Sequence, residues 1–143
     1  MTRILKYFFS LLAIISLISC TDSDKDMATY FGGKIINPKS EYVLLYHQDK
    51  LIDSLHLDEH DKFIGKYEKF KEGFYTFKHG PEHQYVFIEP QDSILIRLNT
   101  WGVFDESLVF SGKGAEKNNI LIDYYLEGEK EYKNRELYSY YSL

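Results

Sequence analysis

The chain has 143 residues, with 22 acidic and 17 basic side chains, and its formal net charge at pH 7 is −5 when the histidines are neutral. This length suits one domain, and the negative charge makes nucleic acid and anionic lipid surfaces poor candidates for partners. The single cysteine, Cys20, excludes an intramolecular disulfide bond.

The segment 1–19 has the pattern of a bacterial export signal. Arg3 and Lys6 give it a positive start, and residues 7–18 form an apolar stretch that is too short for a membrane span, which needs roughly 20 residues. The stretch ends in Leu17-Ile18-Ser19-Cys20, which resembles the lipobox of bacterial lipoproteins. The resemblance implies that the signal is cut before Cys20 and that this cysteine carries lipid, so that the membrane becomes a partner. An ordinary secretory signal followed by a free or buried thiol is the alternative.

Residues 20–29 are expected to form an acidic tether between the lipid and the folded domain. The stretch Thr21-Asp22-Ser23-Asp24-Lys25-Asp26 is polar and charged, so it cannot contribute to a core. The same stretch resembles the acid-rich sorting signals of Bacteroidetes-type lipoproteins. We therefore expect a lipid-anchored protein of the cell envelope, located in the outer membrane and facing either the periplasm or the cell surface.

Residues 30–112 are expected to form a β-sandwich or open barrel. Alternation is clear in the run 93–98, where Ile94, Ile96 and Leu98 share one face. A period of two with short connections favours hairpins and antiparallel sheets, and eight strands are enough for two layers. Eight runs rich in Ile, Val, Tyr and Phe are separated by Gly, Pro, Asn and Asp: 30–36, 41–47, 51–57, 62–68, 74–78, 84–88, 93–98 and 108–110.

Residues 113–143 are expected to be helical. The stretch Ser111-Gly112-Lys113-Gly114 lacks the Gly-Lys-Ser/Thr ending of a phosphate-binding loop. It is therefore interpreted as a flexible hinge between strand and helix. A helix is predicted from about Ala115, weakened or broken near Gly128. Aromatic residues continue to the last residues without a helix-stop signal, which suggests a truncated segment. The stripe at helical spacing consists of Ile120, Leu121, Tyr124, Tyr125 and Tyr132, followed by Leu137, Tyr138 and Tyr141.

The run from Phe110 to Leu121 resembles a segment of a known family. In that family a strand ends in a phenylalanine, a Gly-x-Gly follows, and an asparagine opens a helix. The family comprises amino-terminal domains of unknown function, of β-sandwich type, that precede a thioredoxin-like domain in Bacteroidetes-type lipoproteins. The resemblance covers about residues 30–126. Further matches in the same order are Ile52-Asp53-Ser54, Leu57-Asp58, Lys62-Phe63, Glu72-Gly73-Phe74-Tyr75 and Ile88 to Ile94.

This sequence departs from the family at two places. Pro90-Gln91-Asp92 stands where the family usually has Pro-Gly-Asp, and glutamine disfavours the positive φ that glycine accepts freely. The Cys-x-x-Cys pair to which the family's redox chemistry belongs is absent, because the thioredoxin-like domain is absent. Thiol-disulfide oxidoreductase activity therefore does not transfer to this chain.

Histidines and carboxylates give the remaining candidates for chemistry. His79 and His83 have metal-ligand spacing, but Gly80-Pro81 between them favours a loop, so they are weak candidates and we expect neither metal nor cofactor. Glu89 and Asp92 flank one turn, and Asp58 and Asp61 flank another. Capping of turns is the commoner role of such aspartates.

The leading hypothesis is a non-catalytic, lipid-anchored module of the cell envelope with a binding or positioning role. One alternative is a truncated or split thioredoxin-like oxidoreductase without its redox domain. A second is a carbohydrate-binding or hydrolytic surface lipoprotein. It would use an exposed tyrosine ladder, the Glu89 and Asp92 pair, or the histidine pair. Packing of the tyrosine rings in the sandwich is the commoner explanation of the ladder, which consists of Tyr42, Tyr46, Tyr67, Tyr75 and Tyr85.

Overall fold

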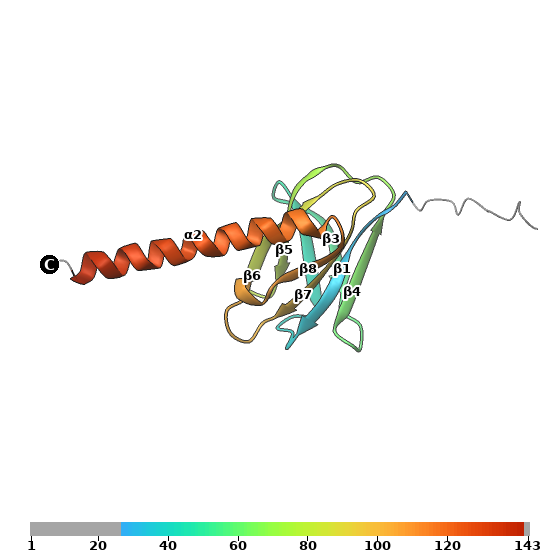
Figure 1. Cartoon of the computed structure of the whole chain (residues 1–143). Coiled ribbons are helices and arrows are strands. Elements are labelled where there is room, and N and C mark those ends of the chain that lie inside the picture. Colours follow the sequence, from blue (N-terminus) through green and yellow to red (C-terminus); the bar gives the residue numbers. More distant parts are fainter. Residues whose placement is uncertain (1–26, 142–143) are drawn as a thin grey trace, which may run out of the picture.

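A computed structural model describes the backbone of residues 27–141 and the side chains of residues 27–135, and it contains two four-stranded sheets followed by a long helix (Figure 1). The predicted eight strands and mainly β fold are confirmed. The sheets are not closed into a barrel, so the architecture is a sandwich. The strands are β1 (Thr29–Ile36), β2 (Tyr42–His47), β3 (Lys50–His56), β4 (Lys62–Tyr67), β5 (Gly73–His79), β6 (Glu82–Ile88), β7 (Ser93–Asn99) and β8 (Val109–Lys113).

The first sheet has the strand order β4-β1-β7-β8 and the second has the order β3-β2-β5-β6. All neighbouring strands are antiparallel except β1 and β7, which pair in parallel. This exception arises because the turn between β6 and β7 lies beside the start of β1, where Tyr30 N–H donates to Asp92 O at 2.8 Å. Both strands therefore enter the first sheet from the same end.

The core lies between the two sheets and consists of the side chains that point inward at alternate positions along the strands. Phe31 is fully buried and packs against Phe63 and Phe77, with ring centroids 5.7 Å and 5.9 Å apart. Ile94, Ile96 and Leu98 are buried on one face of β7, as their alternation predicted. Each such side chain stabilises the fold by about 1.5–3 kcal/mol.

Two predicted boundaries of the sandwich move by one residue each. Thr29 is buried in β1 rather than part of the tether 20–29, and its hydroxyl accepts Gln91 N–H at 2.9 Å. The last strand extends to Lys113 because Ser93 pairs with Lys113 across the sheet, so the sandwich ends at Lys113 and not at Gly112.

The helix α2 (Ala115–Tyr141) extends from the sandwich far beyond the sheets (Figure 1). The predicted break near Gly128 is wrong, because the helix is continuous through it. A glycine inside a helix costs only about 0.5–1 kcal/mol relative to alanine, which a helix of this length tolerates. Within residues 27–141, none of the helices has the length and apolar character needed to cross a membrane.

The two faces of α2 were not predicted correctly from spacing alone. Ala115, Asn118 and Ile122 are buried against the sandwich, and Leu126 is partly buried. The described members of the predicted stripe are exposed instead: Ile120, Leu121, Tyr124, Tyr125 and Tyr132.

Candidate functional site

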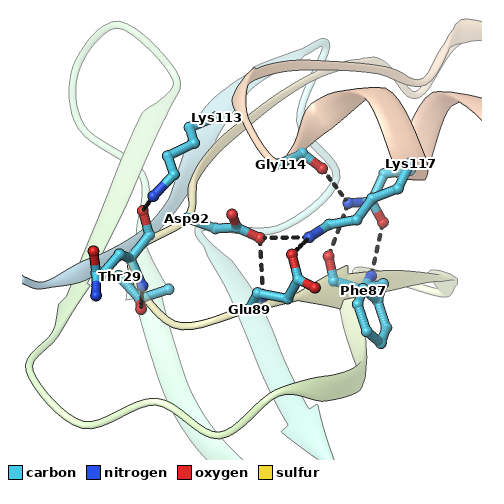
Figure 2. Close-up of polar contacts among 9 residues, drawn as sticks. Thr29, Phe87, Glu89, Asp92, Lys113, Gly114 and Lys117 are labelled. Carbon is cyan, nitrogen blue, oxygen red and sulfur yellow. Dashed lines mark hydrogen bonds and ion pairs between the residues drawn. The ribbon is translucent and has the colours of Figure 1, made fainter.

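The turn between β6 and β7 meets the first turn of α2 in a cluster of charges, which we call the helix junction (Figure 2). It consists of Glu89, Asp92, Gly114, Lys117 and Asn118. Lys117 Nζ lies 3.0 Å from Asp92 Oδ2 and also donates to Glu89 Oε2. The backbone N–H of Glu89 donates to the same Asp92 oxygen at 2.9 Å. Two donors therefore converge on one oxygen of the buried Asp92 carboxylate.

Lys117 is the cation that Glu89 and Asp92 share at the helix junction. Partial burial acts to lower the pKa of Lys117, but the hydrogen bonds with Glu89 and Asp92 outweigh this effect and raise the pKa. A catalytic pair of carboxylates faces a substrate across a cleft, whereas these two carboxylates face one lysine of the protein itself. Glu89 and Asp92 do come together, but their arrangement fixes the turn to the helix.

Two successive asparagines of α2 bind the open edges of the two sheets. Phe87 N–H in β6 donates to Asn118 Oδ1 at 2.7 Å, and Asn118 Nδ2 donates to Phe87 O at 2.8 Å. Asn119 makes the same pair of bonds with Phe110 in β8, at 3.0 Å and 2.9 Å. Because an amide side chain offers one acceptor and two donors, each asparagine replaces the neighbouring strand that these edges lack.

Gly114 allows the chain to turn from β8 into α2 beside the Asp92 carboxylate. Its φ is 92°, and a Cβ atom there would lie 2.4 Å from Asp92 Oδ2. The hinge predicted at residues 111–114 is confirmed only at Gly114, because residues 111–113 belong to β8. Both conformation and space require this glycine. Gln91 has a positive φ of 66°, although glutamine disfavours this conformation.

His79 and His83 do not face the same space. His79 is fully buried, where it accepts Lys39 N–H on Nε2 at 2.9 Å and its Nδ1 lies 3.1 Å from Tyr42 O. Burial lowers the pKa of His79, so the ring is neutral and both nitrogens are occupied by the backbone. His83 is exposed on the other face of the hairpin, opposite Lys78. The geometry gives this pair no shared metal position.

Asp58 and Asp61 hold the connection between β3 and β4. Asp58 Oδ1 accepts the backbone N–H groups of His60 and Lys62 at 2.8 Å and 2.9 Å. These bonds lower the pKa of Asp58, with the bond from Lys62 contributing most. Asp61 has a φ of 60° and its carbonyl accepts Ile35 N–H at 3.0 Å. Both residues form the turn, as expected for aspartates in such loops.

The five tyrosines of the predicted ladder are divided between two environments. Tyr75 is buried and donates to Lys71 O at 2.7 Å, and Tyr67 donates to Asp53 Oδ2 at 3.0 Å. Tyr42, Tyr46 and Tyr85 lie on the outer face of the second sheet. A groove of about 360 Å³ adjoins this face between β6 and α2, with lining residues that include Phe74, Tyr85, Leu121 and Tyr125.

A larger groove of about 630 Å³ crosses the outer face of the first sheet. Its lining combines the cations Lys34 and Lys62 and the carboxylate of Asp58 with residues that include Ile64, Leu95 and Ser111. The sequence analysis did not identify this groove, because its residues come from five strands and one loop that only the fold brings together. The alternation Lys62, Ile64, Lys66 was the visible signal, but only strand pairing places it beside Lys34.

Cys20, the lipobox and the polar stretch 21–26 lie outside the described residues, so lipid attachment stays a prediction. No protein-family model, no curated protein and no solved structure matches this chain. The resemblance to the amino-terminal domains of thioredoxin-like lipoproteins therefore also stays a prediction, and the structure establishes the fold class alone.

Proposed function

We propose that this protein is a non-catalytic, lipid-anchored module of the cell envelope that binds or positions a partner. The observation that carries the proposal is the contrast within α2, which is bonded to both sheets at one end and presents exposed aromatic rings beyond them. The lipobox at Cys20 supplies the attachment to the membrane, and a solvated tether fits the residues that follow it.

The exposed part of α2 has the character of an interaction surface. Leu121, Tyr125, Gly128 and Tyr132 follow one another at intervals of four, three and four residues, so they lie along one side of the helix. Tyr124 and Tyr132 are 78% and 63% exposed, and a groove runs between them past Gly128. Contiguous aromatic surface that remains in water is typical of a protein-binding site.

The side chains considered for chemistry support a non-catalytic role. Lys117 bridges Glu89 and Asp92, the backbone occupies both ring nitrogens of His79, and Asp58 accepts two backbone N–H groups. Each of these groups stabilises a turn or a junction of the fold. A hydrolytic role would need them to converge on a substrate, and their hydrogen bonds direct them to the protein instead.

The anchoring part of the proposal is tested by replacing Cys20 in the producing bacterium. Cys20→Ser removes the acceptor of the lipid, so the protein should leave the membrane fraction and appear in the soluble fraction. Thr21→Ser, one residue later, is the matched control and should stay with the membrane. Membrane fractionation of Cys20→Ser equal to that of the unchanged protein would refute the anchor.

The binding part is tested by photo-crosslinking from the exposed side of α2. A photoreactive residue in place of Tyr132 should give a covalent adduct of one defined mass in intact cells. The same residue in place of Tyr46, on the outer face of the second sheet, is the control and should not give that adduct. Absence of a defined adduct from Tyr124, Tyr125 and Tyr132 would contradict a partner on α2.

A separately encoded redox partner is the second candidate. The observation that favours it is the course of α2, which continues the sandwich outward at the place where a further domain would join in the resembled family. The DNA downstream of the gene is the test. An adjacent reading frame with Cys-x-x-Cys would support this candidate, and its absence would remove it.

A further inference from the structure

The outer face of the first sheet carries a row of three cations that crosses three strands, which we call the cationic row. Lys62 of β4 pairs with Lys34 of β1, and Lys34 pairs with Arg97 of β7. All three are exposed, and none forms an ion pair with a carboxylate of the described residues. Like charges directly opposite one another destabilise a sheet. The row therefore favours an external anion.

The four strands of this sheet differ from the rest of the chain in charge. They contain the cations Lys34, Lys62, Lys66, Arg97 and Lys113 and no aspartate or glutamate. The strands of the second sheet are balanced, since Asp53 and Glu82 accompany Lys50 and Lys78. The chain as a whole is acidic, so the first sheet, whose strands carry a net positive charge, differs in sign from the rest of the chain.

Exposed aliphatic side chains lie next to the cationic row. Ile64 and Leu95 flank Gly32 in the neighbouring row of residues, and they are 59% and 40% exposed. Val109 pairs with Arg97 at the end of the cationic row and is 51% exposed. A small soluble anion would contact the cations but would leave these aliphatic side chains in water. A surface that has anionic heads above an apolar layer uses both kinds of side chain.

The start of β1 limits the distance between this face and the membrane. Thr29 follows Cys20 by nine residues, which span at most about 30 Å when fully extended. Strand β1 lies inside the first sheet, between β4 and β7. A protein held by lipid on Cys20 therefore keeps the cationic row within reach of the headgroups.

We propose that the outer face of the first sheet lies on the anionic phospholipid headgroups of the membrane that carries the anchor. The proposal rests on the lipid anchor and assigns the orientation of the anchored domain. Lys34, Lys62 and Arg97 contact headgroup phosphates, and the neighbouring aliphatic side chains enter the interface. The net charge indicated a poor binder of anionic lipid, but the separation of charge between the two sheets reverses that expectation for this one face.

The test uses residues 20–143 with Cys20→Ser, which contain every described residue and have no lipid. Sedimentation with vesicles measures the affinity for one part phosphatidylglycerol in two parts phosphatidylcholine, and for phosphatidylcholine alone. Binding should require phosphatidylglycerol and weaken as salt is added. Replacing Lys34, Lys62 and Arg97 together by glutamine should weaken binding on the order of 100-fold, since each cation near an anionic membrane contributes about fivefold.

The matched control replaces Lys50, Lys69 and Lys71, which are exposed elsewhere, by glutamine and leaves the same net charge. Retained binding of this control supports the assigned face. Equal losses in both variants, or equal binding to phosphatidylcholine alone, would overturn the proposal. Tighter binding to soluble polygalacturonate than to vesicles would overturn it in favour of an acidic polysaccharide. The protein used with the vesicles carries no lipid, so its binding does not depend on whether Cys20 is lipidated in the cell. Failure of this proposal can therefore be distinguished from failure of the lipid anchor in the fractionation experiment.

Discussion

The first two turns of α2 and the length that follows them belong to one helix but are held in different ways. Near the sandwich, Lys117, Asn118 and Asn119 make charged or amide hydrogen bonds with the turn between β6 and β7 and with both sheet edges. Further along, the side chains of Tyr124 and Tyr132 are largely exposed to water.

The difference shows that polar side chains, rather than the aromatic stripe, attach this helix to the domain. Ile122 is the only large aliphatic side chain that is buried among the described residues of α2. Isolated helical turns gain little from propensity and need tertiary contacts to persist. Substitutions near the sandwich should therefore change the stability of the whole domain, whereas substitutions further along should change only the helix surface.

The largest loss of stability is expected from Asn118→Ala. It leaves the buried N–H and carbonyl of Phe87 and the carbonyl of Gly114 without their partner, at a cost of about 3 kcal/mol. Urea unfolding measures the effect. Asn119→Ala is the matched control with a less buried amide, and its cost should be about 1–2 kcal/mol. A loss below that of Asn119→Ala would show that Asn118 does not fix the helix.

The next largest effect is expected at the glycines of the two regions, with opposite signs. Gly114→Ala places a Cβ atom against the Asp92 carboxylate at a positive φ and should destabilise the domain by about 2 kcal/mol. Gly128→Ala meets no atom within 4 Å and should increase helix content without lowering stability. Urea unfolding and circular dichroism measure the two effects. Equal losses in both variants would contradict the difference between the regions.

A third prediction concerns the pH dependence of stability, which we expect to arise from His79 in the sandwich and not from the helix junction. Burial lowers the pKa of His79 in the folded protein, so only the unfolded chain takes up a proton just below pH 6.5. The stability that neutral His79 contributes is present above that pH and is lost as the pH falls through the folded pKa. The free energy of unfolding should therefore decrease from about pH 7.5 to about pH 5.

The control for this prediction is His79→Gln, which cannot titrate and retains an acceptor for Lys39 N–H. The acid-induced decrease in the free energy of unfolding should be smaller in this variant, while Asn119→Ala should retain the full decrease. An unchanged pH dependence in His79→Gln would assign the loss to other groups. Thermal unfolding at a series of pH values gives the comparison.

Local rules were sufficient for the strands and for the hinge. The alternation in the run 93–98 predicted the buried face of β7, and Gly112-Lys113-Gly114 marked the passage from strand to helix, because both signals depend on adjacent residues. The prediction of a break near Gly128 was wrong because it also relied on a local signal alone. A local penalty of less than about 1 kcal/mol does not end a helix that continues on both sides.

Pairing across the sheets could not be predicted in the same way. Lys62, Lys34 and Arg97 become neighbours only through the registers of β4, β1 and β7, and the parallel pairing of β1 with β7 has no local signal. Asn118 and Asn119 were visible as the opening of a helix, but their roles depend on which strands are left at the edges. Spacing on α2 likewise gave no indication that Ile122, rather than Leu121, faces the core.

The smallest effect on stability is expected from Tyr132→Ala in the exposed length of α2. Its ring is 63% exposed and the residue lies beyond the turns that contact the sandwich, so the change should stay within about 0.5 kcal/mol. Ile122→Ala is the contrasting variant, since it removes a buried side chain and should cost about 2–3 kcal/mol. Urea unfolding distinguishes the two. A cost for Tyr132→Ala near that of Ile122→Ala would mean that the aromatic side of α2 contributes to the fold, and the case for a partner-binding surface there would be lost.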